Sequence, residues 1–404
     1  MEPLYLDHAA TSPPLPEALA AFERACRQTP ANPGSPHHAG AAAALALEDA
    51  RETVRRALGA PEHRLVWTSC GSEANALGIL GLARAHRRRA EKAGGGRARV
   101  LVGAAEHPSA LLNARALAEE GFVVDEVPVD AAAVVRPDTL AERLGPDVAL
   151  VVVQWANNEV GSLNPVAELT ALTRRLAPQA AFHCDAVQAA GKRPEPIAAL
   201  GADAVAVAAH KLGGVRGTAA LLLAPGAREP RPLWRGGGHE GGLRSGTENV
   251  MGAVAFAAAA RRRRADLDAD PEAWSRRRGA LLEALRAVAP DLVVVGADAE
   301  PAWLGSILSV AFPGFRARTL LTALEAEGVL VGSGSACHGS GPERPSPVLL
   351  AAGLPEPLLG SVLRFSLGGH ESDADVARAA AALTRARTRL AGGPAARDVP
   401  TRRA

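Results

Sequence analysis

Short apolar runs alternate with amphipathic stretches through the first two-thirds of the chain. Continuous Val, Leu and Ala runs predict strands, because strands covered on both faces show no polar alternation. Such runs lie at 64–69, 99–103, 122–127, 147–154, 180–184, 203–208 and 218–223, and helical patterns lie at 73–92, 108–120 and 166–177. This order predicts an α/β fold with a mostly parallel sheet and helices on both of its faces.

The pattern changes near residue 250. An Ala- and Arg-rich helical stretch covers 250–288, with a break near Asp270-Pro271, and strands and helices then alternate to about residue 391. This change predicts a second, smaller α+β unit, as the length of 404 residues also favours. We place the large domain at 16–255, the small domain at 1–15 and 256–392, and a disordered tail at 393–404.

Composition narrows the classes of function. Lys and Arg (45) nearly balance Asp and Glu (43), so we expect neither a nucleic-acid nor a membrane partner. The Arg clusters at 86–89, 261–264 and 276–278 are interpreted as solvated helix faces, because acidic residues lie nearby. The start shows no signal-peptide pattern, and no apolar run approaches about 20 residues, which predicts a cytoplasmic protein. Four distant cysteines without a C-x-x-C pair predict neither a disulfide framework nor a metal site.

Two charged residues follow apolar strands, where a buried charge is costly unless it has a partner or a chemical role. Lys211, in AVAAHKLGGVRG, can form a Schiff base with an aldehyde, although a snorkelling surface lysine is the alternative. Asp185, in AFHCDAVQAAGK, would suit the protonated pyridine nitrogen of pyridoxal phosphate, and a helix N-cap is its alternative.

Two further motifs fit the same cofactor. Gly71 and Ser72, in WTSCGSEANALGI, lie where a strand turns into a helix whose N-terminus can bind a phosphate, although a plain capping box fits locally. His107, in VGAAEHPSALL, can stack on a planar cofactor or move a proton, with an ordinary loop histidine as the alternative.

Other polar residues suggest contacts with a substrate. Asn157 and its neighbours in ANNEVG, and Gln188, follow strands at the end of a parallel sheet where ligands bind. Arg364, inside the apolar run SVLRFSLG, can bind a carboxylate or form a structural ion pair. Cys337, in GSGSACHGSG, is either a thiol that visits a bound substrate or an incidental loop cysteine.

The order of these motifs is more specific than any one of them. YLDHAATSP, NPGSPHHAG, TSCGSEAN, EHPSALL, ANNEVG, FHCDAVQAAGK, AHKLGG, GGGHEGGLRSGTEN, GSGSACHGS and LRFSLG together resemble the cysteine desulfurases of the NifS/IscS type, from about residue 5 to about residue 370. These enzymes are pyridoxal-phosphate-dependent members of aminotransferase class V. The resemblance implies the type I pyridoxal-phosphate transferase fold, with a seven-stranded sheet in the large domain.

The resemblance also implies roles for individual residues. Lys211 holds pyridoxal 5'-phosphate as a Schiff base, His107 stacks on the ring and relays protons, Asp185 pairs with the pyridine nitrogen, and Gln188 lies near the phenolic oxygen. The implied phosphate ligands are Gly71, Ser72, His210 and, from a second subunit, Thr247, so a homodimer with shared sites is expected. The implied contacts of the substrate carboxylate are Asn32, Asn157 and Arg364, and Cys337 receives the sulfur.

Three positions depart from the family pattern around the phosphate. Cys70 replaces a usual Gly, Ala208 stands where many members have Ser, and Gly241 replaces a common Arg. These changes can lower the affinity for the cofactor phosphate, but none removes a catalytic group.

The implied reaction converts L-cysteine to L-alanine and leaves the sulfur on Cys337 as a persulfide. An acceptor protein would then take the sulfur, and an iron–sulfur scaffold, a tRNA thiolation protein and a biosynthetic carrier are all open. The alternatives within the family are a selenocysteine lyase, a C–S β-lyase and an aminotransferase. A lyase that releases sulfide directly has no need of Cys337. The alternative from another class is a non-catalytic or nucleic-acid-binding scaffold that kept the fold.

Overall fold

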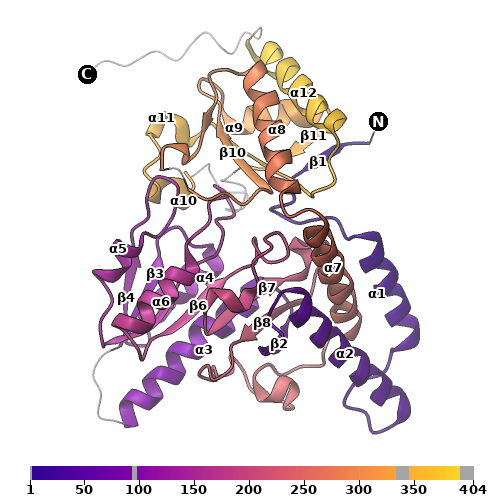
Figure 1. The fold of residues 1–404 in the computed structure, drawn as a ribbon, viewed down its shortest axis with the longest axis vertical. Helices are drawn as coiled ribbons and strands as arrows, with labels where there is room; N and C mark the ends of the chain where they lie inside the picture. Colours follow the sequence, from indigo (N-terminus) through magenta and orange to yellow (C-terminus); the bar gives the residue numbers. More distant parts are fainter. Residues whose placement is uncertain (1, 93–97, 300, 334–344, 392–404) are drawn as a thin grey trace.

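The computed structural model describes residues 2–92, 98–299, 301–333 and 345–391. It shows a large lobe built around one sheet and a smaller lobe above it in Figure 1. The strands are β1 (Leu4–Leu6), β2 (Arg64–Thr68), β3 (Arg99–Gly103), β4 (Val123–Val127), β5 (Val148–Val152), β6 (Ala181–Asp185), β7 (Ala204–Ala208), β8 (Ala219–Leu223), β9 (Val293–Val294), β10 (Ile307–Ala311), β11 (Val329–Val331) and β12 (Val362–Ser366). The helices are α1 (Pro16–Gln28), α2 (His38–Ala57), α3 (Gly71–Lys92), α4 (Pro108–Ala116), α5 (Pro137–Ala141), α6 (Val166–Leu176), α7 (Val250–Ala269), α8 (Ala273–Val288), α9 (Ala317–Ala326), α10 (Pro347–Ala351), α11 (Glu356–Leu359) and α12 (Asp373–Ala391).

The large sheet has seven strands in the order β2-β8-β7-β6-β5-β3-β4. The pairs from β7 to β4 are parallel, which confirms the predicted fold class. Strand β8 pairs antiparallel with both β7 and β2, a feature that the apolar pattern did not reveal. Only residues 209–218 join β7 to β8, and a short connection without a long helix suits an antiparallel pair.

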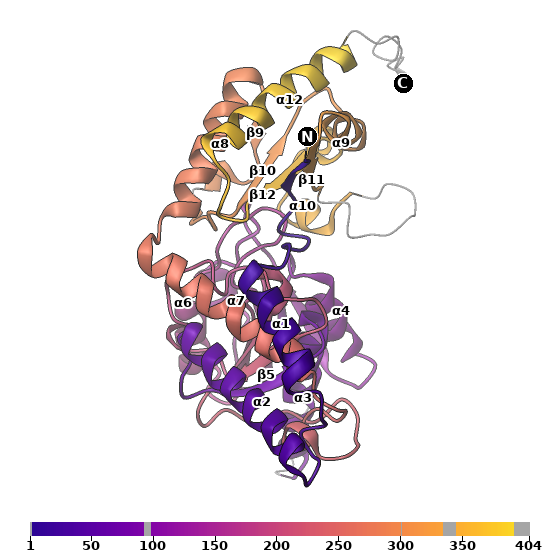
Figure 2. The ribbon, with the colours of Figure 1, turned by 90° about the vertical axis from the view of Figure 1, so that its right-hand side faces the viewer.

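Helices cover both faces of this sheet, as the continuous apolar runs predicted. In β2, Leu65 and Trp67 pack into the core shared with α2, α6 and α7, whereas Val66 packs into the core shared with α3 and α4. The alternation follows from the two-residue period of a strand. Figure 2 shows α1, α2 and α7 side by side on one side of the large lobe.

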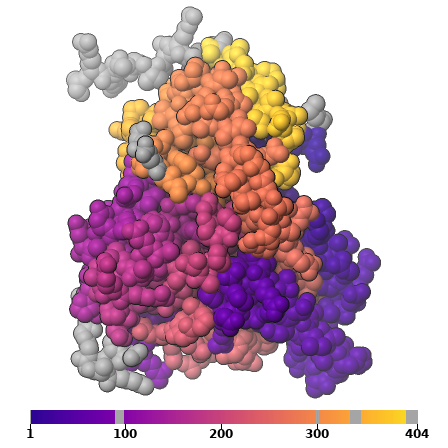
Figure 3. Space-filling view, in the orientation of Figure 1, coloured from indigo at the N-terminus to yellow at the C-terminus, as the bar shows by residue number. Residues whose placement is uncertain are grey.

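The smaller lobe contains the antiparallel sheet β12-β10-β9 and the parallel pair β1-β11. Helices α8, α9 and α12 pack on one another and on these strands. The chain therefore begins in the smaller lobe at β1, builds the large lobe and returns through α7 and α8, as the colours in Figure 3 show. The predicted domain limits stay a prediction, and the limit at residue 255 falls inside α7.

Two predictions fall on parts of the chain that the structure does not describe. Cys337 lies within 334–344, and the predicted disordered tail lies within 392–404, both outside the described residues. Among the helices that the structure does describe, none combines the length and apolar character that a membrane span requires.

Candidate active site

A cavity of about 220 Å³ lies at the carboxyl ends of the parallel strands β3, β5, β6 and β7. This edge is where ligands bind in open α/β sheets. Seven residues predicted to bind the cofactor line it together: Gly71, Ser72, His107, Asp185, Gln188, His210 and Lys211. The remaining lining residues are Cys70, Asn75, Ser109, Gln154, Ala156, Asn158 and Val187.

Lys211 lies in a single 3₁₀ turn, Ala209–Lys211, directly after β7. Its Nζ donates hydrogen bonds to the carbonyl oxygens of Ala9 (2.5 Å) and Ala10 (2.7 Å). The Ala9 carbonyl oxygen also accepts a hydrogen bond from Gln188 Nε2 at 3.0 Å. The N-terminal segment that follows β1 therefore forms one wall beside the lysine amine.

Asp185 is the last residue of β6, and its side chain is buried. Oδ2 accepts a hydrogen bond from Asn75 Nδ2 at 2.7 Å, and Oδ1 accepts one from the Val187 backbone N–H at 2.9 Å. Both of these donors are neutral. A buried carboxylate is costly without a cationic partner, so the arrangement favours a ligand that brings a positive charge into the cavity.

Asn75, on α3, connects this carboxylate to two other residues. Its Nδ2 also donates to Ser109 Oγ at 2.9 Å, and its Oδ1 lies 3.0 Å from His183 Nε2. Because Oδ1 is an acceptor, His183 carries its proton on Nε2. Burial lowers the pKa of His183 to about 4, so its ring is neutral. The resulting network of neutral donors fixes the position of the Asp185 carboxylate.

Gly78, one turn further along α3, makes this network possible. A Cβ atom at residue 78 would lie 2.3 Å from His183 Nδ1, which is far inside van der Waals contact. Any larger residue would push the ring of His183 away from Asn75 or α3 away from the sheet.

His107 precedes α4 and caps it. Its Nδ1 accepts a hydrogen bond from the Ser109 backbone N–H at 3.1 Å and lies 2.7 Å from Ser109 Oγ. Burial lowers the pKa of His107, and the charge of Lys211 acts in the same direction while that of Asp185 opposes it. The ring is therefore a neutral imidazole with its proton on Nε2.

Glu106, next to His107, is a second buried acid at this edge of the sheet. Its Oε1 accepts a hydrogen bond from the Gln154 backbone N–H at 2.7 Å. Burial raises the pKa of Glu106 well above its usual range, and the charge of Asp185 acts in the same direction.

The N-terminus of α3 faces the cavity at Gly71 and Ser72. The same turn has the capping contact considered above, since Glu73 Oε2 accepts a hydrogen bond from the Ser69 backbone N–H at 2.7 Å. Arg244 Nε also binds Glu73 Oε1 at 2.8 Å. The helix cap and the phosphate site are thus compatible, because the cap uses Ser69 and leaves Ser72 at the cavity wall.

Four of the predicted residues that the structure describes lie outside this cavity, namely Asn32, Asn157, Thr247 and Arg364. Asn32 is exposed between α1 and α2, where its Oδ1 accepts a hydrogen bond from the Gly34 backbone N–H at 2.8 Å. Asn157 is fully buried, and its Oδ1 accepts hydrogen bonds from the backbone of Glu159 and Val160.

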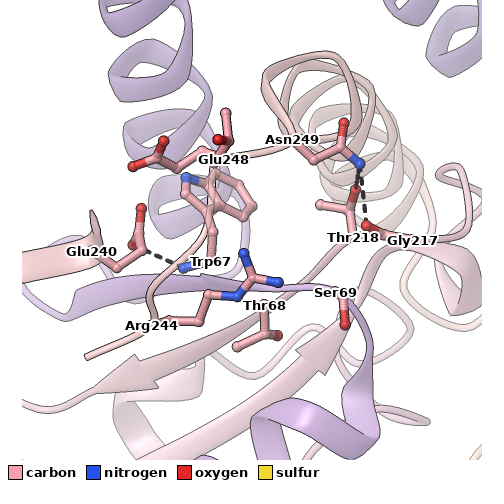
Figure 4. A pocket seen from close by; sticks show the side chains of 10 residues that line it. Trp67, Thr68, Ser69, Gly217, Thr218, Glu240, Arg244, Glu248 and Asn249 are labelled. Carbon is pink, nitrogen blue, oxygen red and sulfur yellow. Dashed lines mark hydrogen bonds between the residues drawn. The ribbon is translucent and has the colours of Figure 1, made fainter. Parts of the chain in front are cut away.

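Thr247 is exposed and lines a second cavity with Trp67, Ser69, Thr218 and Arg244, shown in Figure 4. Asn249 Nδ2 donates hydrogen bonds there to Thr218 Oγ1 (3.1 Å) and the Gly217 carbonyl oxygen (3.2 Å). These contacts fix the start of α7 next to Thr247.

Arg364 is buried on β12 and does not line the cofactor cavity. It forms an ion pair with Asp7 (2.9 Å), the structural alternative considered above, and donates to the Asn158 carbonyl oxygen (2.9 Å). Its Nε is buried without a hydrogen-bond partner among the described residues. Arg364 thus contacts the backbone of Asn158, whose side chain lines the cavity.

The polar lining residues with side-chain amides or hydroxyls that the sequence analysis did not select as site residues are Asn75, Ser109, Gln154 and Asn158. Asn158 stood in the polar run ANNEVG, but the sequence does not tell which of two adjacent amides turns inward. Asn75 closes the motif TSCGSEAN about one turn after α3 begins, but the motif did not indicate its contact with Asp185, which only the fold creates.

The lining fits pyridoxal phosphate on three observations. Among the described residues, Asp185 has only neutral hydrogen-bond donors, the α3 N-terminus faces the cavity at Ser72, and two buried amide oxygens, Asn158 Oδ1 and Gln188 Oε1, have no hydrogen-bond partner. Unpaired buried polar atoms are rare in folded proteins, so they mark a place for a polar ligand.

Comparisons with known proteins agree with this geometry. The family model described as aminotransferase class-V matches residues 4–379. An IscS-like cysteine desulfurase of Mycobacterium tuberculosis is 38% identical over 377 residues, covering 92% of this chain and 93% of the relative. The cysteine desulfurase NifS of Azotobacter vinelandii is 35% identical over 382 residues, covering 94% and 91%.

The solved structure of a NifS-like protein superposes with a TM-score of 0.86 at 29% identity, covering 96% of this chain and 100% of that one. The chain therefore belongs to the pyridoxal-phosphate-dependent aminotransferase class V family and is similar within it to the cysteine desulfurases.

Proposed function

We propose that this protein is a cysteine desulfurase, which converts L-cysteine to L-alanine and transfers the sulfur to Cys337 as a persulfide. The observation that carries the proposal is the single cavity that brings Lys211, His107 and Asp185 together at the N-terminus of α3. Pyridoxal phosphate, when bound, supplies an electron sink for negative charge at the substrate α-carbon. The residues of the chain bind it, orient the substrate and move protons.

We assign roles to several of the lining residues. We assign the pyridine nitrogen to Asp185, whose position is fixed by Asn75, and the phosphate to Gly71, Ser72 and His210. Gln188 lies beside Lys211 through their shared acceptor, Ala9, which suits a contact with the phenolic oxygen.

Proton transfer falls to Lys211 and His107. The Lys211 amine is the base that takes the α-proton of the substrate once it is neutral. His107 is already neutral and holds its proton on Nε2, so it can stack on a planar ring and pass that proton onward.

We assign the substrate carboxylate to Arg364 together with Asn158. Arg364 is anchored by Asp7 and has one unpaired N–H group, Nε, for an anion. Asn158 replaces Asn157 in this assignment, because the Asn157 side chain is bound to its own loop. Asn32 stays a proposed contact that would require the exposed turn between α1 and α2 to meet the substrate.

The proposed role of Cys337 is supported by the residues on either side of its segment. Gly332 exchanges two backbone hydrogen bonds with Arg364, and Ser346 Oγ donates a hydrogen bond to Glu159 Oε2 at 2.5 Å. Both ends are therefore joined to the elements that carry Arg364 and Asn158. Cys337 is four residues beyond Ser333, so the chain allows it to extend up to about 14 Å from that residue.

In the sulfur-transfer step the Cys337 thiolate attacks the sulfur of the substrate. A new S–S bond forms, the C–S bond breaks, and its electron pair stays on the carbon fragment, which takes up protons to become L-alanine. The persulfide sulfur then passes to an acceptor protein, and iron–sulfur cluster assembly is one pathway that would consume it.

We further propose a homodimer in which Thr247 completes the phosphate site of the partner subunit. Its exposure beside a second cavity supports a contact between chains. Mixing Lys211→Ala and Thr247→Ala chains tests this directly. If Thr247 acts in the partner's site, the mixed dimer contains one intact site and regains activity that both parent variants lack. No recovery in a verified mixed dimer would refute the shared site.

Product analysis with L-cysteine tests the reaction itself. A desulfurase yields alanine and protein-bound sulfur in equal amounts, whereas a C–S β-lyase yields pyruvate, ammonia and free sulfide. The Cys337→Ser variant is the matched control, because it should keep the cofactor absorbance and lose sulfur transfer. Pyruvate as the main product, or unchanged alanine formation in Cys337→Ser, would contradict the proposal.

A further inference from the structure

A second cluster of ligand-type side chains lies outside the cofactor cavity. His8, just after β1, meets His370 and Glu371 from the loop between β12 and α12. One potential ligand atom from each residue lies within 4.8 Å of the other two, and His8 Nε2 is 3.8 Å from Glu371 Oε1. The sequence predicted no metal site, because residues 8 and 370 are neighbours only in the fold.

The protonation of His8 follows from its hydrogen bonds. Ser12 Oγ donates its proton to the Lys211 carbonyl oxygen (3.4 Å). It therefore acts as the acceptor in its contact with His8 Nδ1, 3.3 Å away. His8 therefore carries its proton on Nδ1. Its Nε2 is left with a free electron pair, and this atom is buried without a hydrogen-bond partner among the described residues. His8 itself is only 2% exposed.

This arrangement is the one found around histidine ligands of metal ions. A ligating imidazole binds the ion with one nitrogen and donates a hydrogen bond with the other, which fixes its orientation. Here the outer contact of His8 is Ser12, and the free nitrogen is directed at the Glu371 carboxylate.

Glu371 and Gly368 hold the other side of the cluster. The buried Glu371 carboxylate accepts hydrogen bonds from the backbone N–H groups of Gly368 (2.5 Å) and Gly369 (3.1 Å), so its direction is fixed. A Cβ atom at residue 368 would lie 2.5 Å from both His8 Cε1 and His370 Cε1. Glycine at this position therefore lets the two imidazole rings approach each other.

The cluster opens onto a cleft of about 840 Å³ between the N-terminal segment, α7 and the start of α12. The exposed His370 lies at this opening. Two cations, Lys192 and Arg263, act on His8 from the protein side, and Arg263 is partly neutralised by Asp266 at 3.5 Å. Glu371 supplies the negative charge that offsets them at the cluster.

We propose that His8, His370 and Glu371 form a binding site for a divalent cation of the Zn²⁺ class, with the fourth position open to the cleft. Imidazole and carboxylate ligands suit this ion, and three protein ligands with one open position form a common tetrahedral site. A tetrahedral site needs ligand atoms about 3.3 Å apart, so binding requires His8 Nε2 and Glu371 Oε1, now 3.8 Å apart, to approach slightly and the exposed His370 to rotate toward them. The ion ties the segment after β1 to the loop before α12.

Zinc binding to the full-length holoenzyme tests this site. Because thiols also bind zinc, the parent protein carries Cys26→Ser, Cys70→Ser and Cys337→Ser. ZnCl₂ is titrated in competition with a chromophoric chelator. We expect one zinc ion per chain in the parent, and at least about tenfold weaker binding in the same protein with His370→Ala. The exposed His38→Ala, on α2, is the matched control and should bind as the parent does.

Thermal unfolding gives an independent readout, because a ligand that binds the folded state raises its melting temperature. Zinc should raise the melting temperature of the parent and of His38→Ala, but not of His370→Ala. Glu371→Gln should weaken zinc binding in the same way, and if that variant fails to fold, the exposed His370→Ala alone decides. The site is refuted if the parent binds no zinc, or if His370→Ala binds it as tightly as the parent.

Discussion

Replacing Asn75 by alanine would remove the amide that joins the Asp185 carboxylate to the rest of the fold. In the variant, Asp185 Oδ2 loses its 2.7 Å donor and His183 Nε2–H loses its 3.0 Å acceptor. Both groups are buried, and His183 Nδ1 already lacks a partner among the described residues. An unsatisfied buried polar group costs about 1–3 kcal/mol, and more when it is charged.

We therefore expect Asn75→Ala to lower the free energy of unfolding of the cofactor-free protein by about 3–5 kcal/mol. Urea unfolding at a fixed protein concentration measures this value. Asn113→Ala, on α4, is the control. Asn113 Nδ2 makes a hydrogen bond to the Ser109 carbonyl oxygen at 2.7 Å within the same helix, which is worth about 1 kcal/mol. A loss in Asn75→Ala no greater than in Asn113→Ala would refute the proposed network.

Two other substitutions test the charges at the site. Asp185→Asn replaces the proposed charge-assisted contact with the pyridine nitrogen of the cofactor by a neutral one. We therefore expect turnover of L-cysteine to fall about 10- to 150-fold. Turnover within twofold of wild type would contradict the assignment of Asp185 to the pyridine nitrogen. Burial raises the pKa of Glu159 to about 7 from its ordinary value of 4.5, so the folded state holds a proton that the unfolded state releases between these values. The Glu159 carboxyl thus destabilises the fold as the pH rises through this window, and Glu159→Gln should gain stability relative to wild type between about pH 5 and pH 8, by at most about 3 kcal/mol. Urea unfolding of wild type and Glu159→Gln at about pH 5 and about pH 8 measures this gain. A stability difference between the two proteins that is the same at both pH values would contradict a raised pKa of Glu159.

The strands of the large lobe were predictable because a strand buried on both faces is a continuous apolar run, which is visible in the local sequence. The runs at 148–152, 204–208 and 219–223 are apolar throughout, and each is a buried strand in the structure. The direction of β8 was not predictable from its composition. An antiparallel strand covered on both faces has the same apolar pattern as a parallel one, and only the short link from β7 distinguishes it.

The candidate site was predictable where a residue sits at a strand end, and less so elsewhere. Lys211, Asp185 and His107 follow strands, and parallel strand ends meet at one edge of the sheet. The sequence does not distinguish Asn157 from Asn158, because a loop conformation decides which amide faces inward. The contact of Lys211 with Ala9 and Ala10 depends on the N-terminal segment returning to the large lobe, which no local pattern reveals.

Mass spectrometry of the purified holoenzyme after incubation with L-cysteine tests the central claim most directly. Peptides are mapped without reductant to locate added sulfur, and a borohydride-treated sample locates the cofactor. The account predicts one added sulfur atom on Cys337 and a cofactor fixed to Lys211. Sulfur on another cysteine such as Cys70, or cofactor fixed to a lysine other than Lys211, would contradict it.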